Sequence, residues 1–241
     1  MVAEQLKQQY NFLSEQFSII GNRSSNEDKV IVLNSNDWQL LLMADGMGGY
    51  NNGEAAAELA IEIITEYFSK SPEGAIKDIN SVFKYANNAI SEKLSGAGTT
   101  IGGIFLCEGN AKIFWAGDVR VYLIDSANTK YVTKDHSLAQ LMRESGTIVN
   151  PSEINRLKNT VTRGLGGNST SYMPELVSFN LAANSRGFIC SDGVHNLFTD
   201  SEIFTLLSQS EESSIMDSIK KRIYKQGMDN ASAILFSYSI V

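Results

Sequence analysis

The segment WQLLLMADGMGG, residues 38–49, places an acidic, glycine-rich turn directly after a run of strongly apolar residues. Its first seven residues, 38–44, have the length and the side chains of a buried β-strand. Asp45 and Gly46 follow at once, and the glycines leave the backbone open, so that a carbonyl can reach a cation or a ligand can come close. The turn has neither the lysine of a P-loop nor the GxGxxG register, so it does not predict a nucleotide-binding loop.

Three more aspartates occupy the same kind of position. Asp118 follows the apolar run IFWAG, Asp192 follows FICS, and Asp229 precedes ASAILFSY. Where strands share a sheet, such ends come together, and carboxylates about 5 Å apart repel by about 3 kcal/mol per pair at an effective dielectric of about 20. A divalent cation removes this repulsion, and ligands that are all oxygen favour Mg²⁺ or Mn²⁺ over zinc. Each aspartate alone is more typical of an ordinary turn, but the four together predict a metal site.

The rest of the chain alternates short β-rich runs with blocks of helix-forming sequence. Helical periodicity covers residues 54–70 and a second segment from Ser71-Pro72 to Gly96, while a later block begins with a capping box at Thr199 and ends at Gly227. Strands joined by tight turns predict antiparallel sheets, and grouped helices predict that helices cover the outer faces. The expected strands are 17–20, 29–33, 38–44, 99–107, 111–116, 119–124, 130–133, 187–190 and 231–241.

These patterns predict an α+β sandwich in a single domain that covers residues 1–241. No Pro-, Ser- or Gly-rich linker, charge block or internal repeat divides the sequence. The stretch at about 134–170 combines short helical pieces with many turn residues, which is typical of a surface excursion. We expect this flap-like segment to take part in recognition.

The composition restricts the partners and the compartment. Hydrophobic residues make up 43% and there are only 3 Pro, so the chain is globular and can bury a core. The net charge of -7 opposes binding to nucleic acid and to anionic membranes.

Cys107 and Cys190 lie in apolar runs, which predicts buried thiols in a reducing compartment. The first sixteen residues lack an apolar signal core and no run reaches the ~18–20 apolar residues of a span, so we expect a cytoplasmic protein without membrane insertion.

Eight short motifs occur in a fixed order between about residues 17 and 238. They are Arg23-Ser24-Ser25-Asn26-Glu27-Asp28, Ala44-Asp45-Gly46-Met47-Gly48-Gly49, Gly98-Thr99-Thr100, Gly117-Asp118-Val119-Arg120-Val121-Tyr122, Asp135-His136-Ser137, Thr162-Arg163-Gly164-Leu165-Gly166, Ser191-Asp192-Gly193 and Asp229-Asn230. Each motif is weak alone, yet the ordered set resembles the PP2C-type (PPM) metal-dependent Ser/Thr protein phosphatases. The short chain and the DGMGG variant resemble the bacterial branch of that family.

The resemblance implies a four-layer αββα sandwich of two antiparallel β-sheets flanked by helices, with a binuclear metal centre at the sheet edge. It implies two tightly bound Mn²⁺ or Mg²⁺ ions and room for a third, weaker one. By resemblance, Asp45 bridges the two ions and the Gly46 carbonyl joins one of them. Asp192 and Asp229 complete one site, and Glu27 serves the other directly or through water.

Three further residues match positions of the family near the ions. Asp28 matches an additional acidic position, and Asp118 matches the position associated with the third ion. Arg23 matches the arginine that holds the substrate phosphate, a suitable role because guanidinium pairs bidentately with phosphate oxygens. The alternative for Arg23 is a surface arginine paired with Glu27 or Asp28.

Other positions depart from the family or carry no catalytic expectation. Met47 stands where many eukaryotic members have a histidine proposed to protonate the leaving group, and methionine transfers no proton. Asn196 stands where an aspartate often lies near the third ion, which weakens that site. We expect His136 to have a structural hydrogen-bonding role and His195 to be a loop residue.

The implied activity is hydrolysis of phosphoserine and phosphothreonine on proteins by a metal-activated water, opposing a Ser/Thr protein kinase. The sequence contains no GxSxG, HExxH or Cys-His signature for a competing chemistry. The implied partners are phosphorylated proteins, namely a kinase or its substrates, and the chain is expected to be a monomer that binds no nucleic acid. Two alternatives stay open: a catalytically inactive binding module with the same fold, and a phosphatase dedicated to one regulatory protein.

Overall fold

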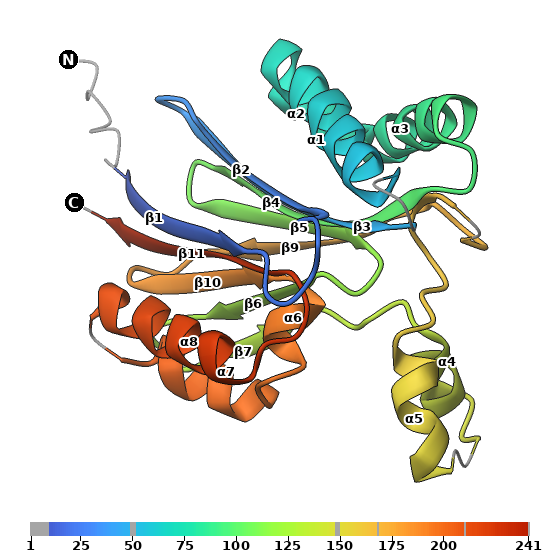
Figure 1. The fold of residues 1–241 in the computed structure, drawn as a ribbon. Helices are drawn as coiled ribbons and strands as arrows, with labels where there is room; N and C mark the ends of the chain where they lie inside the picture. Colours follow the sequence, from blue (N-terminus) through green and yellow to red (C-terminus); the bar gives the residue numbers. More distant parts are fainter. Residues whose placement is uncertain (1–9, 49–51, 148–149, 168, 210, 241) are drawn as a thin grey trace, which may run out of the picture.

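Two antiparallel sheets stacked face to face form the centre of the molecule (Figure 1). The structure, a computed structural model, describes residues 10–48, 52–147, 150–167, 169–209 and 211–240. The first sheet has the order β1-β11-β10-β6-β7. Its strands are β1 (Tyr10–Ile19), β6 (Arg120–Ile124), β7 (Lys130–Val132), β10 (Ser185–Cys190) and β11 (Ala231–Ile240).

The second sheet has the order β2-β3-β4-β5-β9, and a short strand β8 also pairs with β4. Its strands are β2 (Asp28–Asn34), β3 (Trp38–Met47), β4 (Gly98–Cys107), β5 (Asn110–Ala116), β8 (Leu165–Gly166) and β9 (Glu175–Asn180). Strand β3 lies inside this sheet, paired with β2 on one side and β4 on the other.

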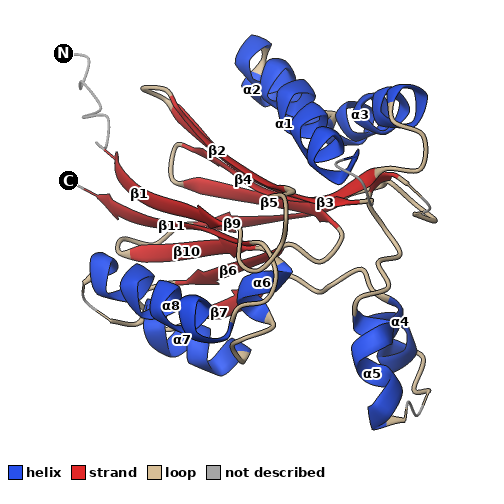
Figure 2. Cartoon of the chain, in the orientation of Figure 1, coloured by secondary structure: helices blue, strands red, loops and turns tan. Residues whose placement is uncertain are grey.

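Helices cover the outer face of each sheet (Figure 2). Three cover the second sheet: α1 (Asn52–Lys70), α2 (Pro72–Lys77) and α3 (Ile79–Lys93). Three others cover the first: α6 (Asp192–His195), α7 (Asp200–Leu207) and α8 (Glu212–Gln226). The remaining pair, α4 (Leu138–Glu144) and α5 (Pro151–Lys158), extends away from both sheets (Figure 1).

Strand β3 is apolar on both faces because both faces are buried. Side chains alternate along a strand, so Leu40 and Leu42 pack with α1 and α3, while Leu41 and Met43 pack between the two sheets. A strand that is buried on both faces has a continuous run of apolar residues in its sequence. The buried strand therefore delivers Asp45, which follows it directly, to a fixed position at the edge of the sandwich.

The expected αββα sandwich is confirmed, and three local expectations differ from the structure. Strand β1 begins at Tyr10, because all ten of its residues pair with β11 despite their polar character. The helical segment 71–96 is broken at Asp78, whose φ of −113° and ψ of 40° separate α2 from α3. The prediction missed β9, an edge strand with alternating exposure that pairs with β5.

Both cysteines are free; Cys190 is buried, as predicted, and Cys107 is only half-buried. Over the ranges that the structure describes, no helix combines the length and the apolar composition needed to cross a membrane.

A glycine opposite a large aromatic ring sets a packing constraint between β10 and β11. Gly187 is the register partner of Phe236, and a Cβ at position 187 would lie 1.9 Å from a ring carbon of this buried side chain. We predict that Gly187→Ala lowers the free energy of unfolding by about 1–3 kcal/mol, because the ring must leave its position in the core. Denaturant unfolding measures the change. Ser178→Ala on the exposed side of β9 is the control, expected within about 0.5 kcal/mol of wild type, and equal effects of the two would contradict the prediction.

Candidate metal centre

One cavity of about 720 Å³ lies at the edge of the sandwich where strand ends from both sheets meet. Its acidic residues come from separate parts of the chain: Asp45 from β3, Asp118 from the turn before β6, Asp192 from the start of α6 and Asp229 from the loop before β11. The described residues that line it are Arg23, Ser24, Ser25, Glu27, Asp45, Gly46, Met47, Gly48, Thr100, Asp118, Asn159, Val161, Asp192, Asp229 and Asn230.

The register of the second sheet places two polar residues beside Asp45. Asp45 pairs with Asp28 of β2 and with Thr100 of β4, and side chains of paired residues point to the same face of a sheet. Asp28 is 3% exposed, and its Oδ2 accepts a hydrogen bond of 2.8 Å from the Ser191 hydroxyl. Asp28 is therefore buried beside Asp45 and is not among the described residues that line the cavity.

Close backbone packing brings Glu27 to the same edge. The Gly46 amide donates to the Glu27 carbonyl at 3.1 Å. A Cβ at Gly46 would lie 2.3 Å from the Gly53 carbonyl oxygen, and a Cβ at Gly53 would lie 2.3 Å from Oε2 of Glu27. The start of α1 can approach Asp45 and Glu27 this closely only because neither glycine carries a side chain.

Asn230 organises the loops around the cavity, and the sequence analysis gave it no role. It is 7% exposed. Its Oδ1 accepts from the Glu27 amide at 2.9 Å, and its Nδ2 donates to the carbonyls of Ile20 and Ser25 at 2.8 and 2.9 Å. Its place directly after Asp229 is the one signal that could have identified it.

Arg23 supplies positive charge at the rim. Its Nη2 donates to Oδ2 of Asp229 at 2.6 Å, and its side chain is 59% exposed. The alternative pairing with Glu27 or Asp28 is wrong, because the arginine reaches across to the loop before β11 instead. An exposed pair of this kind contributes little to stability, so the guanidinium is free to exchange Asp229 for an anionic ligand.

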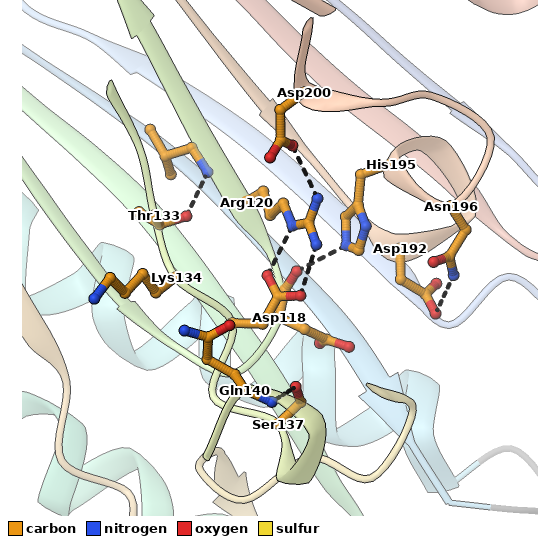
Figure 3. Close-up of polar contacts among 12 residues, drawn as sticks. Asp118, Arg120, Thr133, Lys134, Ser137, Gln140, Asp192, His195, Asn196 and Asp200 are labelled. Carbon is orange, nitrogen blue, oxygen red and sulfur yellow. Dashed lines mark hydrogen bonds and ion pairs between the residues drawn. The ribbon is translucent and has the colours of Figure 1, made fainter. Parts of the chain in front are cut away.

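Two segments hold the last carboxylates in place. Asp192 is the first residue of α6, and its Oδ2 accepts from Nδ2 of Asn196 at 3.2 Å. Asp118 is 8% exposed, and its backbone carbonyl accepts from Nε2 of His195 at 3.0 Å (Figure 3). The expectation that His195 is a loop residue is wrong, because it lies in α6 and is buried.

Burial and mutual repulsion raise the pKa values of Asp28, Asp45, Asp118 and Asp192. Burial, followed by the charges of Asp28 and Asp192, raises the pKa of Asp45 well above its usual value. Burial likewise raises the pKa of Asp118 to about 8, and the pKa values of Asp28 and Asp192 to about 6. The site therefore favours carboxyl groups that are protonated or bound to a cation over free, ionised carboxylates.

The residues present fit divalent cations. Oδ1 of Asp28 and Oγ1 of Thr100 are buried and, within the described ranges, lack a hydrogen-bond partner. Carboxylates, a carbonyl and hydroxyls make an all-oxygen donor set suited to Mg²⁺ or Mn²⁺. As the side chains now stand, no three described Asp, Glu, His or Cys residues are grouped tightly enough to hold an ion. Like charges repel, and Asp229 is paired with Arg23, so we expect these side chains to turn toward one another when an ion binds.

The structure brings most of the predicted site residues to one cavity. Those on its wall are Arg23, Glu27, Asp45, Gly46, Asp118, Asp192 and Asp229, and Met47 joins them. Gly49 lies outside the described residues. The structural role expected for His136 is confirmed by its hydrogen bonds to Gly117 and Glu175. The sequence analysis missed Thr100, Asn159 and Val161 as cavity residues, because only the folded chain places them there.

Comparison with known proteins gives one family. The family model described as Protein phosphatase 2C matches residues 17–226. The serine/threonine phosphatase stp of Listeria innocua is 26% identical over 238 residues, which cover 91% of this chain and 92% of the relative. The serine/threonine protein phosphatase PstP of Mycobacterium tuberculosis is 28% identical over 223 residues, which cover 88% of this chain and 42% of that longer protein.

Solved structures share the fold. The catalytic domain of PstP in complex with two manganese ions superposes with a TM-score of 0.79 at 26% identity, covering 95% of this chain and 99% of that one. A serine/threonine phosphatase of S. agalactiae gives a TM-score of 0.81 at 24% identity, with 94% and 99% covered, which supports the fold alone.

The raised pKa values predict how pH and metal change stability. Between about pH 4, where unfolded aspartates ionise, and about pH 8, the pKa of Asp118, the folded chain holds more protons than the unfolded chain. Its free energy of unfolding should therefore fall as pH rises through this window in the presence of a chelator. We predict a lower Tm at pH 8 than at pH 5, and a rise in Tm when Mn²⁺ or Mg²⁺ is added at pH 8.

Differential scanning calorimetry at several pH values measures this effect, with Asp118→Asn as the matched variant. The amide cannot ionise, so the decline between pH 6 and pH 8 should be smaller in Asp118→Asn. Parallel pH profiles for the variant and wild type would contradict the electrostatic account.

Proposed function

Because this chain belongs to the protein phosphatase 2C family, we propose that the cavity around Asp45 is where it dephosphorylates phosphoserine and phosphothreonine in proteins. The chain is a protein serine/threonine phosphatase, like the relatives that it resembles over most of their length. One observation carries the assignment of the site: carboxylates from five separate segments and an exposed arginine line the same cavity. An inactive binding module is not favoured, since none of the predicted acidic positions has been lost.

We propose that two divalent cations bind between Asp45, the Gly46 carbonyl, Asp192 and Asp229, with Glu27 at the second ion. The fit of the donor set supports this, as does the presence of two manganese ions in the PstP structure. Bound divalent cations supply an acidified water as nucleophile and neutralise charge on the phosphoryl group. The choice between Mn²⁺ and Mg²⁺ depends on supply, since both accept these oxygen ligands.

Arg23 binds the substrate phosphate in this proposal. Its guanidinium is already directed at Asp229 on the cavity wall, and it is more than half exposed. When the cations hold Asp229, the same guanidinium can donate two parallel hydrogen bonds to phosphate oxygens. It thus provides the local positive charge that a chain of net charge -7 needs for an anionic substrate.

We propose that Asp118 assists the departure of the leaving group, which is the serine or threonine hydroxyl of the substrate. Met47 lines the cavity but cannot donate a proton, so the leaving group requires another source. Asp118 lies on the same wall of the cavity. Asn196 contacts Asp192, and its side-chain oxygen is an uncharged atom that could ligate a cation. We assign a third, weaker cation site to this side of the cavity.

The segment at about 134–170 belongs to the same domain and contacts the substrate in this proposal. Asn159 and Val161, which follow α5, line the cavity. A phosphoprotein bound at Arg23 would therefore meet this segment as well. We propose a monomeric enzyme of the cytoplasm that acts on a protein kinase or its substrates, which includes the case of one dedicated regulatory protein.

We predict that Asp45→Asn lowers kcat for a phosphothreonine peptide and for an aryl phosphate by at least about 10³-fold, because the substitution removes the charge shared by two cations. Steady-state hydrolysis with added Mn²⁺ measures this loss. Asp37→Asn, on the exposed turn between β2 and β3, removes a carboxylate outside the cavity and serves as the control. A kcat within about tenfold of wild type for Asp45→Asn would exclude this assignment.

Arg23→Ala should lower kcat/KM by about 10²-fold while Mn²⁺ binding, measured by calorimetry, is retained. Arg23→Lys should recover only part of the loss, because an ammonium group cannot form the bidentate pair. Lys221→Ala on the exposed face of α8 removes a positive charge elsewhere and should have no effect. Unchanged kinetics in Arg23→Ala would remove Arg23 from the phosphate site.

A further inference from the structure

The two histidines of the chain hold two adjacent residues, Gly117 and Asp118. The sequence contains two histidines, His136 and His195, and they approach this turn from different segments. Each ring is 7% exposed, and the described residues that line the cavity include neither. The imidazoles are therefore placed to support the cavity wall from behind.

His136 exchanges two hydrogen bonds with Gly117. Its backbone amide donates to the Gly117 carbonyl at 2.9 Å, and its Nδ1 accepts from the Gly117 amide at 3.1 Å. An accepting Nδ1 requires a neutral ring with the proton on Nε2, which donates to Oε1 of Glu175 at 3.1 Å. The ring also stacks on Trp115 with 7° between the planes, so its orientation is fixed.

His195 holds the next residue from α6. Its Nε2 lies 3.0 Å from the Asp118 carbonyl oxygen, which can only accept, so this ring too carries its proton on Nε2 (Figure 3). The His136 ring therefore binds the peptide group between Ala116 and Gly117, and its backbone amide binds the peptide group before Asp118. The His195 ring binds the peptide group after Asp118.

Neighbouring contacts leave this turn little freedom. Gly117 has a φ of +123°, and a Cβ there would lie 2.3 Å from Cβ of Thr100, so the turn is pressed against β4. After the turn, Arg120 donates Nε and Nη2 to the two carboxylate oxygens of Asp135 at 2.7 and 2.8 Å. Asp135 directly precedes His136, so these two residues fasten the turn at both ends.

We propose that His136 and His195 are positioning residues that fix the orientation of the Asp118 carboxylate in the cavity. This inference rests on the proposed function, in which Asp118 assists departure of the alcohol. Neither histidine touches the substrate. Each acts through one hydrogen bond to the backbone, and an error of about 1 Å in a reacting group can cost about 10²-fold in rate.

Amide side chains of two lengths test each contact separately. At position 136, Asn places an acceptor near the site of Nδ1 and preserves the bond from Gly117, whereas Gln reaches Glu175 and loses that bond. At position 195 the order is reversed, because Gln reaches the Asp118 carbonyl and Asn falls short. We expect His136→Asn and His195→Gln to keep kcat for a phosphothreonine peptide within about threefold of wild type, and His136→Gln and His195→Asn to lower it by about 10- to 100-fold.

The losses should appear in kcat, with KM and the calorimetric affinity for the two tight Mn²⁺ ions unchanged. They should also be smaller for an aryl phosphate, whose departure needs little protonation. In a double-mutant cycle, His136→Gln or His195→Asn should cause no further loss in an Asp118→Ala background, because the same function is already absent. Equal behaviour of Asn and Gln at each position, or additive losses in the cycle, would overturn the proposal.

A measurement on the unaltered protein separates this inference from the proposed function. Long-range ¹H–¹⁵N spectra of the two imidazoles at pH 7 should show neutral rings protonated on Nε2 in both. An Nδ1-protonated or exchanging ring at either position would refute the positioning role of that histidine even if the enzyme is active. If wild type shows the expected tautomers but no Mn²⁺-dependent hydrolysis, the proposed function fails, and with it the catalytic role of the two histidines.

Discussion

Repulsion among the carboxylates that share one cavity is the constraint on which the rest of the structure depends. Asp45, Asp118, Asp192 and Asp229 lie at the ends of apolar segments, and burial with mutual repulsion raises the pKa values of the first three. A flexible chain would relieve this repulsion by moving the groups apart. The sandwich limits that separation to movements of the side chains, since each carboxylate follows or precedes an element anchored in a buried core.

The two-sided burial of β3 provides the firmest of these anchors. Its alternate side chains belong to two different hydrophobic clusters, one under α1 and α3 and one between the sheets. A register shift by one residue would exchange these two sets and would move Asp45 away from Asp28 and Thr100. Core packing thereby fixes the position of a charged side chain that packing alone would exclude from the interior.

Polar residues outside the metal positions perform the finer placement. Asn230 ties the segment that carries Arg23 and Glu27 to the loop before β11, and the two histidines hold the turn that carries Asp118. Backbone groups in these loops have no strand partner, so side chains satisfy them and fix their geometry at the same time. The centre thus has a rigid frame, while Arg23 at its rim remains exposed and able to change partners.

Features that depend on neighbouring residues could be predicted from the amino-acid sequence alone. Apolar runs that end in aspartate, helical periodicity and the Thr199 capping box follow from local chemistry, and they predicted the sandwich and the acidic cavity wall. Only the tertiary structure decided contacts between distant segments. The Arg23–Asp229 pair spans 206 residues, Asp28 meets Ser191 across 163, and β1 and β9 exist as strands because β11 and β5 pair with them. Such contacts form when the core closes, and the side chains of Asn230 or His195 carry no local pattern that identifies their partners.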